Sequence, residues 1–241
     1  MPISATSLPQ PQKYTATVEK KEQLTSRVWF VTFALKDPPS ITFLAGQTIV
    51  LLITPDVTRS MSIASPPSDA QHILMCHDVS PNGQGSQWTM RLNVGDTVQF
   101  MAPLGIFVLD KESHRKKILA ATGTGIAPFR SMLYDYLEHG GTDDITLYWG
   151  MRYEEDLFWV SEMTALSAKY PNFRFIISLS QPPDTWQGKR GHVTEHIMQE
   201  EQNLPGTDFY LCGNQNMIKD VENQLIAKGV PKGQICKELY F

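Results

Sequence analysis

Cysteine is scarce in this sequence, and its scarcity excludes several kinds of centre. The three cysteines, Cys76, Cys212 and Cys236, lie far apart, whereas a disulfide framework or a zinc site needs paired thiols. An iron–sulfur cluster needs about four cysteine ligands, so we expect none. His192 and His196 have the spacing of one helical face but lack the glutamate of a zinc motif. We therefore expect no bound metal and a reducing compartment.

Long apolar runs and excess positive charge are also missing. No stretch reaches the roughly 18 apolar residues of a membrane-spanning helix. The first residues carry no basic side chain before Lys13 and no apolar run of signal-peptide length. The net charge of −4 leaves no cationic excess to neutralise nucleic acid phosphates or an anionic membrane. These absences predict a cytoplasmic protein that binds neither membranes nor nucleic acid.

The residue pattern changes once along the 241 residues, which predicts two domains, 1–112 and 113–241. From Tyr14 to Leu109, short runs of β-forming residues alternate with breaks rich in proline, asparagine and glycine, which is typical of an antiparallel β-barrel. From Arg115 on, β-type runs alternate with segments whose apolar residues recur every three or four positions. This alternation predicts an open, parallel α/β sheet.

The second domain is expected to contain five strands. They are predicted at 116–122, 144–150, 173–180, 207–213 and 234–241, with helices at 127–139, 154–169, 192–201 and 216–229. Trp149, Phe158 and Trp159 are interpreted as core residues. In an open parallel sheet, ligands bind at the carboxyl ends of the strands. The candidate binding residues at these ends are Gly123, Thr124, Gly125, Gly150, Arg152, Ser180, Gln181, Cys212 and Gly213.

The clearest single motif is the segment 120–128, Ala-Ala-Thr-Gly-Thr-Gly-Ile-Ala-Pro. It ends a predicted strand, turns on Gly123 and Gly125, and enters a predicted helix with Pro128 near its first turn. Glycines let the main chain approach a ligand, and a helix N-terminus attracts phosphate, so we interpret the segment as a pyrophosphate site. It lacks the third glycine of the common dinucleotide fingerprint. A plain strand-to-helix turn remains the alternative.

Two weaker signals lie in the first domain. The segment Arg59–Ser62 follows an apolar strand. An arginine can grip phosphate with two donors, and a nearby hydroxyl can address a ring of the same ligand; a solvated turn is the alternative. Gly83, Gly85 and Ser86 precede a short predicted helix at 87–92. Their amides can hold a second phosphate, with Ser86 as cap or ligand, and a hairpin turn is the alternative there.

Taken in order, these motifs resemble those of the ferredoxin reductase superfamily, in which a flavin-binding barrel precedes a nicotinamide nucleotide domain. Arg59–Ser62 is similar to the family's Arg-x-Tyr-Ser flavin motif, Gly83–Ser86 to its G-x-x-S flavin phosphate helix, and Gly123–Pro128 to its GTGIAP loop. Leu147–Leu157 is similar to its Y-G-x-R-x-x-x-D-L segment, and Tyr210–Met217 to its Y-x-C-G-x-x-x-M segment. The resemblance covers nearly the whole chain.

The resemblance implies roles in the flavin half of the protein. Arg59 would pair with the phosphates of FAD, and Ser62 would hydrogen-bond near flavin N5. The backbone around Gly85 and Ser86 would hold the pyrophosphate. The flavin-binding residues implied in the first domain are Arg59, Ser60, Met61, Ser62, Gly83, Gly85 and Ser86.

In the nucleotide half, the resemblance implies that Gly123–Gly125 holds the phosphates of NADH or NADPH. Cys212 would lie beside the nicotinamide C4, and Glu238 near the flavin. Tyr240 or Phe241 would lie against the flavin ring. The implied catalytic residues are Ser62, Cys212 and Glu238. The residues implied to bind the nucleotide are Gly123, Thr124, Gly125, Pro128, Gly150, Arg152, Ser180, Gln181, Cys212, Gly213 and Met217.

Two departures from the family pattern bear on the cofactors. Met61 stands where the family usually has tyrosine, so the aromatic side chain that packs on the flavin is absent from this position. Ser180 is followed by Gln181, whereas family members that prefer NADPH commonly have Ser-Arg there. An arginine or lysine is the usual partner of a 2′-phosphate. We therefore favour NADH, although Arg152, Lys189 and Arg190 can also serve a 2′-phosphate.

The resemblance implies an oxidoreductase that moves hydride from NAD(P)H to bound FAD and then electrons to ferredoxin, flavodoxin or an oxygenase component. The cofactor carries the chemistry and the protein orients it, which fits the lack of a catalytic triad or metal motif. The chain is expected to be a monomer. Two alternatives stay open: a flavin reductase that releases its flavin, and a non-catalytic electron-transfer subunit of a larger complex.

Overall fold

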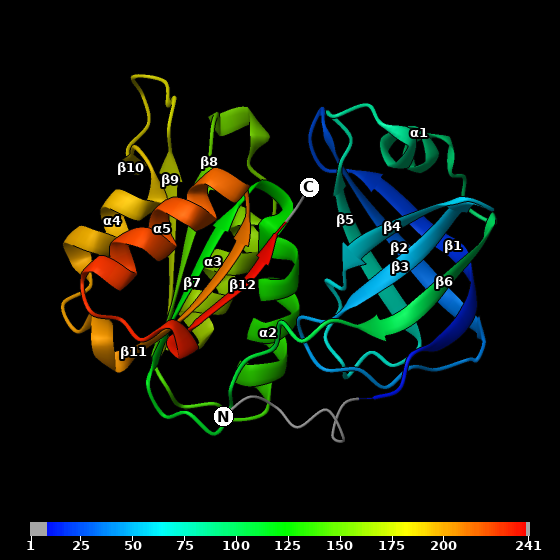
Figure 1. Ribbon diagram of the computed structural model, residues 1–241. Coiled ribbons are helices and arrows are strands. Elements are labelled where there is room, and N and C mark those ends of the chain that lie inside the picture. Colours follow the sequence, from blue (N-terminus) through cyan, green and yellow to red (C-terminus); the bar gives the residue numbers. More distant parts are fainter. Residues whose placement is uncertain (1–8, 240–241) are drawn as a thin grey trace. The chain divides into compact units, whose positions relative to one another are not determined.

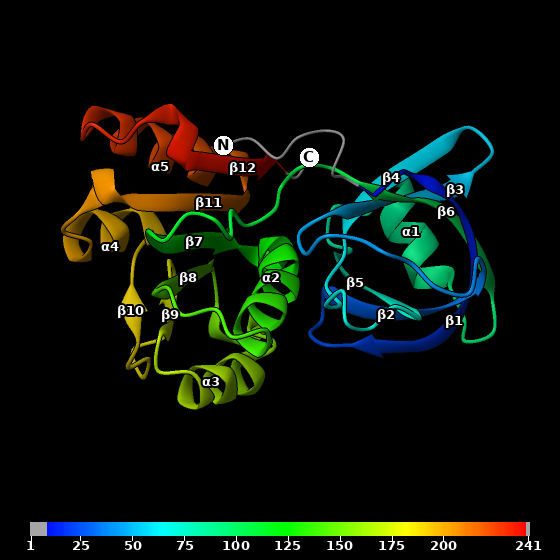
Figure 2. The ribbon, with the colours of Figure 1, turned by 90° about the horizontal axis from the view of Figure 1, so that it is seen from below.

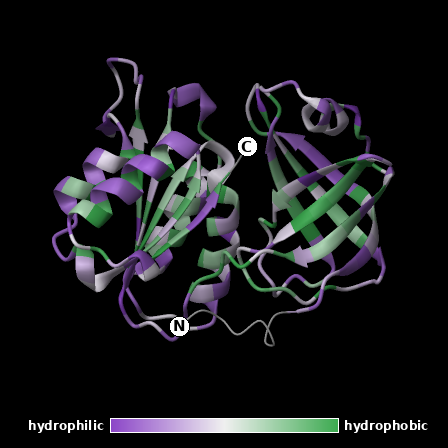
Figure 3. Ribbon diagram, in the orientation of Figure 1, coloured by the Kyte–Doolittle hydropathy of each residue, from purple (hydrophilic) through white to green (hydrophobic). Residues whose placement is uncertain are grey.

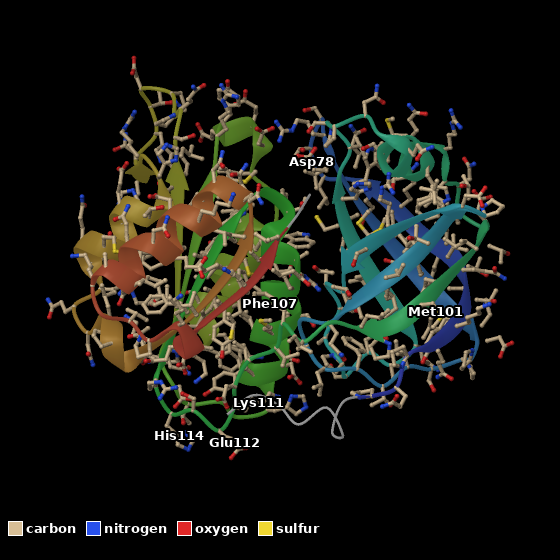
Figure 4. All side chains as sticks on the ribbon, in the orientation of Figure 1. Asp78, Met101, Phe107, Lys111, Glu112 and His114 are labelled. Atoms are coloured by element: carbon tan, nitrogen blue, oxygen red, sulfur yellow. The ribbon has the colours of Figure 1, made fainter. Side chains whose placement is uncertain are left out.

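The computed structural model describes residues 9–239, which form two compact units. The first unit takes the chain up to Asp110 together with Ala127–His139, and the second takes Lys111–Ile126 together with the chain from Gly140 on. Lys111, Glu112 and His114 lie on the segment where the chain enters the second unit (Figure 4). Packing therefore groups helix α2 (Ile126–Glu138) with the first unit. The domain bounds 1–112 and 113–241 stay a prediction.

The first unit is built on a curled, six-stranded antiparallel sheet (Figure 1). In the order β4-β3-β6-β1-β2-β5, its strands are Val57–Ser62, Thr48–Thr54, Thr97–Leu104, Gln12–Gln23, Val28–Asp37 and His72–Asp78. Just after β4, the Ala64 amide donates to the carbonyl oxygen of Leu74 on β5 at 2.8 Å. This bond joins the chain just beyond one edge strand to the other edge strand, so the predicted antiparallel barrel is confirmed as a curled, partly closed sheet.

Alternation of apolar and polar residues fills the barrel interior. On β1, Tyr14, Ala16 and Val18 are buried while the residues between them are partly exposed, as expected for a strand with one face on the core. The ring of Tyr14 stacks on that of Phe100 of β6, with centroids 5.6 Å apart. Figure 3 shows hydrophobic residues concentrated along the strands of each unit.

Strand β4 was not predicted, and the sequence explains why. Its residues, Val-Thr-Arg-Ser-Met-Ser, are mostly polar and offer little β-type pattern. Pairing with β3 makes the segment a strand, with Arg59 opposite Leu51 and Ser62 opposite Thr48. The alternative of a solvated turn at Arg59–Ser62 was wrong.

The second unit contains a six-stranded sheet whose pairings are all parallel. In the order β10-β9-β8-β7-β11-β12, the strands are Lys189–Arg190, Phe173–Leu179, Ile145–Met151, Lys116–Thr122, Thr207–Gly213 and Ile235–Leu239. Helices α4 (Val193–Glu200) and α5 (Gln215–Ala227) cover one face, and α3 (Val160–Lys169) covers the other (Figure 2). The predicted parallel α/β sheet is confirmed, but the predicted count of five strands was wrong. The additional strand, β10, has only two residues and no hydrophobic pattern.

The helix predicted at 154–169 was wrong in its first part. Residues Glu154–Asp156 form a single 3₁₀ turn, and α3 begins at Val160. Trp159 precedes α3 with a φ of +52°, in the left-handed region that is unfavourable for a bulky side chain. The left-handed residue separates the 3₁₀ turn from α3. The apolar residues of both segments follow one helical period in the sequence, which is why a single helix was predicted. No helix among residues 9–239 is long and apolar enough to span a membrane.

Candidate functional site

Arg59 and Ser62 lie on opposite faces of β4, which is an edge strand of its sheet. Side chains alternate along a strand, so Arg59 shares a face with Met61, and Ser62 shares the other face with Ser60. Arg59 is exposed, Met61 packs on the barrel core, and Ser62 is buried. A ligand that contacts both Arg59 and Ser62 must therefore extend along or around this edge strand.

Helix α1 (Gln84–Arg91) places its first turn beside Arg59. It begins after Gly83, so the hairpin alternative was wrong, and Ser86 is the third helical residue rather than the cap. A Cβ atom on Gly85 would lie 3.1 Å from Cγ of Arg59, so the arginine stem packs directly on the helix backbone. Within the described chain no side chain caps this helix. A helix N-terminus next to a guanidinium suits a phosphate group.

His77 holds α1 against the barrel, a role that the sequence did not reveal. Its Nδ1 lies 2.8 Å from the Thr89 hydroxyl on α1. Burial lowers the pKa of His77 to about 4; the charge of Asp78 opposes this shift and that of Arg59 adds to it. His77 is therefore neutral near pH 7 and links β5 to the helix that carries Gly85 and Ser86.

Helix α2 binds the chain that follows Ser62. Its Arg130 donates to the carbonyl oxygen of Ala64 at 2.7 Å, and its buried Ser131 donates to that of Ser65 at 2.6 Å. The rings of Phe107 and of Phe129 on α2 lie 5.7 Å apart. These contacts fix the backbone within three residues of Ser62.

In the second unit, the ends of β7 and β11 meet backbone to backbone. A Cβ atom on Gly125 would overlap the carbonyl oxygen of Cys212, and one on Gly213 would overlap Thr122. The Thr122 hydroxyl oxygen accepts a hydrogen bond from the Asn214 amide at 2.8 Å. The two predicted strand-end segments therefore form one continuous surface, on which glycine is required by the close approach.

The loop Gly123–Gly125 forms a single 3₁₀ turn that leads directly into α2. Gly123 has a φ of +56°, which favours glycine. Pro128 is the third residue of α2, inside its first turn, where its missing N–H leaves no helical bond unmade. The predicted arrangement of strand, loop and helix is present, and its use as a pyrophosphate site stays a prediction.

The ends of β8 and β9 run side by side at the next position along the sheet. The Ser180 amide donates to the Met151 carbonyl and the Gln181 amide to the Arg152 carbonyl, at 3.0 and 2.9 Å. Arg152 also donates from Nε to Oε1 of Gln181 at 3.3 Å. Gly150 lies at the same end, where a Cβ atom would be 3.0 Å from Val193.

An open pocket of about 500 Å³ adjoins these strand ends. Three of its lining residues follow β8 and three follow β9: Tyr153, Glu154, Glu155, Gln181, Pro182 and Pro183. Sequence reasoning found only Gln181 as a binding residue here. The others lie in irregular chain just past the strands, and the strand ends themselves were the only signal that could have pointed to them.

Cys212 and Glu238 are register partners on the neighbouring strands β11 and β12. The Cys212 side chain is buried and that of Glu238 is half-buried. Asn214 caps α5 by accepting from the amide of Met217 at 3.4 Å and from that of Asn216. Tyr240 and Phe241 lie outside the described residues.

Comparisons with known proteins match both halves of the chain. Residues 15–109 match the model of an oxidoreductase FAD-binding domain, and residues 119–223 match that of an oxidoreductase NAD-binding domain. The chain is 30% identical over 241 aligned residues to ferredoxin–NADP reductase B of Sorangium cellulosum, covering 96% of this chain and 99% of that protein. The chain belongs to the ferredoxin reductase superfamily. It is an FAD-dependent oxidoreductase that uses NAD(P)H.

One further relative and one solved structure are similar to this chain. The toluate 1,2-dioxygenase electron transfer component of Pseudomonas putida is 30% identical, with 94% of this chain and 67% of that protein covered. The crystal structure of the Amycolatopsis cytochrome P450 reductase GcoB shares the fold, with a TM-score of 0.89 at 23% identity over 97% of this chain and 71% of that one.

The residues of this ferredoxin reductase superfamily member fit both cofactors. In the first unit, Arg59 packs on Gly85 at an uncapped helix N-terminus, as a flavin pyrophosphate requires. In the second, Gly125 and Gly213 bring the main chain of two strand ends close enough to leave a smooth backbone surface for a dinucleotide. Each unit thus has a main-chain segment whose geometry suits a phosphate group.

Proposed function

We propose that this oxidoreductase passes electrons from NADH, through tightly bound FAD, to a separate ferredoxin or oxygenase component. The proposal is supported by two segments of different construction whose geometry suits phosphate, one in each unit: Arg59 with helix α1, and the loop Gly123–Gly125. The relatives named above include a ferredoxin–NADP reductase and an electron transfer component of a dioxygenase, which supports a protein acceptor.

The flavin supplies the hydride-accepting and electron-donating chemistry when it is bound, and the protein's part is orientation. Arg59 and the amides of Gly85 and Ser86 bind the pyrophosphate. Ser62, whose neighbourhood is fixed by Arg130 and Ser131, offers a hydroxyl to the flavin N5. Met61 replaces the usual aromatic, and a thioether contact with a ring contributes about 0.3–1.5 kcal/mol.

On the nucleotide side, the chain positions the dihydronicotinamide rather than activating it. The loop Gly123–Gly125 and Gly213 bind the phosphates through their main chain. Cys212 and Glu238, which are paired across β11 and β12, flank the nicotinamide end. Placement to about 3–3.5 Å between reacting atoms is what such a transfer needs, and no nucleophile takes part.

The choice of NADH follows from the pocket at the ends of β8 and β9. Glu154 and Glu155 line it, together with the neutral Gln181. Carboxylates accept hydrogen bonds from the ribose hydroxyls of NADH and repel the 2′-phosphate of NADPH. Arg152 is partly engaged by Gln181 and by the ring of Tyr153, whose centroid lies 5.2 Å from its guanidinium carbon.

An anaerobic titration tests this proposal. The purified protein is expected to stay yellow after desalting, to bleach near 450 nm with one equivalent of NADH, and to recover its colour when an oxidised ferredoxin is added. A protein that loses its flavin on desalting but reduces added flavin would instead be a flavin reductase. A coloured protein that NADH and NADPH both fail to bleach would be a non-catalytic subunit. We propose a monomeric, cytoplasmic protein, which gel filtration and cell fractionation can test.

A further inference from the structure

Trp149 connects the interior of the second unit to the nucleotide loop. It lies on β8, is fully buried, and donates from Nε1 to the carbonyl oxygen of Gly123 at 2.9 Å. Gly123 is the first residue of the 3₁₀ turn that precedes α2. The sequence suggested only a core role for Trp149, but the structure shows that its indole N–H donates a hydrogen bond to the loop.

This hydrogen bond orients the next amide of the loop. A trans peptide is planar, with its C=O and N–H pointing in opposite directions. Because the Gly123 carbonyl points toward the buried indole, the N–H of Thr124 in the same peptide points away from it. Gly123 has a φ of +56° and no Cβ atom to restrict rotation, so another contact must fix this peptide plane.

Aromatic rings hold the indole itself in place. Trp149 meets Phe158 edge-on, with centroids 5.0 Å apart, and stacks on Phe175 of β9 at 6.3 Å. Phe158 in turn meets Trp159 edge-on at 5.1 Å. Trp159 is the residue with the unfavourable φ that immediately precedes α3. These ring contacts therefore hold Trp149 in place from β9 and from the residues just before α3.

We propose that Trp149 is a positioning residue for the nicotinamide nucleotide, which fixes the Gly123–Thr124 peptide so that the Thr124 amide faces the pyrophosphate. This inference rests on the proposed function, because it needs the loop to bind a dinucleotide. In this proposal Trp149 increases the affinity of the loop for phosphate without contacting the ligand itself. Trp149 acts on binding and leaves the transfer step itself unchanged.

Two variants of adjacent residues on β8 test the proposal. Trp149→Phe keeps an aromatic ring and removes the indole donor. Tyr148→Phe is the matched control, since it removes one hydroxyl that donates to Glu201 at 2.8 Å, in the core on the α4 and α5 side of the sheet. The flavin-loaded variants are titrated calorimetrically with NAD⁺ and with ADP-ribose, which has the pyrophosphate but no nicotinamide.

Trp149→Phe is expected to raise the Kd of both ligands about five- to ten-fold, as loss of one well-placed hydrogen bond implies. The rate of flavin reduction at saturating NADH should stay within about two-fold, so that KM rises while kcat does not fall. Tyr148→Phe should bind both ligands like the wild type. An unchanged Kd in Trp149→Phe, or an equal loss in both variants, overturns the proposal.

The same measurements distinguish failure of the proposed function from failure of the role of Trp149. If the wild type binds neither NAD⁺ nor ADP-ribose, the proposed function fails, and not only the role of Trp149. If Trp149→Phe does not fold, replacing the indole by benzothiophene keeps the shape of the ring and removes only the N–H. That protein should show the same rise in the Kd of ADP-ribose, and normal binding would overturn the role of Trp149.

Discussion

Gly125 lies with its α-carbon against the carbonyl group of Cys212, so that two segments nearly ninety residues apart share one surface. Any side chain at position 125 would occupy the space of that carbonyl. Because of this contact, the loop after β7 cannot move without displacing the end of β11. It also gives the nucleotide site a steric requirement that is independent of any particular hydrogen bond.

Gly125→Ala is expected to weaken nucleotide binding by more than about ten-fold, because the new methyl group must push the loop away from Cys212. Flavin should be retained, since its site lies in the other unit. Gly123→Ala is the control within the same loop. It has no atom within 4 Å of the added Cβ and meets only the strain of a φ of +56°, about 1 kcal/mol. Calorimetric Kd values for NAD⁺ that rise equally in both variants would contradict the steric explanation.

Ser62→Ala is expected to slow the reduction of flavin by NADH about ten-fold, which corresponds to roughly 1.4 kcal/mol of lost transition-state stabilisation. The fold should persist, because the neighbouring backbone is held by Arg130 and Ser131 through Ala64 and Ser65. Stopped-flow absorbance measures the rate. Thr58→Ala, on the same face of β4 but exposed, is the control, and a rate in Ser62→Ala equal to that of the control would remove Ser62 from the transfer.

Much of the fold could be predicted because its strands are locally typical. Residues 116–122 and 207–213 are buried runs in the middle of a parallel sheet, and both were predicted with the bounds that β7 and β11 have. Strands β4 and β10 could not be predicted, since their polar sequences become strands only by pairing with β3 and β9. Long-range pairing of this kind leaves no periodic signal in the sequence.

The candidate site was predictable where the backbone carries the function. Glycines such as Gly125 and Gly213 are visible in a sequence, and the structure shows the close backbone approaches that require them. The supporting contacts were not predictable. The sequence gives no sign of the contacts of His77 and Trp149, because their partners, Thr89 and Gly123, are brought to them only by tertiary packing.

Gln181→Arg is expected to shift the nucleotide preference toward NADPH. Gln181 lines the pocket that holds Glu154 and Glu155, and an added guanidinium both pairs with a 2′-phosphate and offsets the carboxylates. A charge-assisted hydrogen bond contributes about 1.5–3 kcal/mol, so the ratio of kcat/KM for NADPH to that for NADH should rise at least ten-fold. Gln187→Arg, an exposed position on the same loop that does not line the pocket, is the control. A ratio that is unchanged in Gln181→Arg would place the ribose elsewhere.

His77 makes the first unit sensitive to acid. Burial lowers its pKa from 6.5 to about 4 in the folded protein, whereas the unfolded chain takes up a proton near pH 6.5. The stabilisation is therefore complete above pH 6.5 and is lost as the pH falls from 6.5 to 4. Between pH 7 and pH 5 the free energy of unfolding should drop by about 2 kcal/mol on account of this residue.

His77→Asn removes the titration while its amide can still bond to Thr89, so the difference in unfolding free energy between pH 7 and pH 5 should shrink by about 2 kcal/mol relative to the wild type. Urea unfolding followed by circular dichroism measures it at each pH. His114→Asn is the matched control, because the His114 side chain is 85% exposed. If His77→Asn keeps the full pH dependence of the wild type, the acid sensitivity comes from other groups. If His114→Asn loses it as well, the effect does not arise from burial.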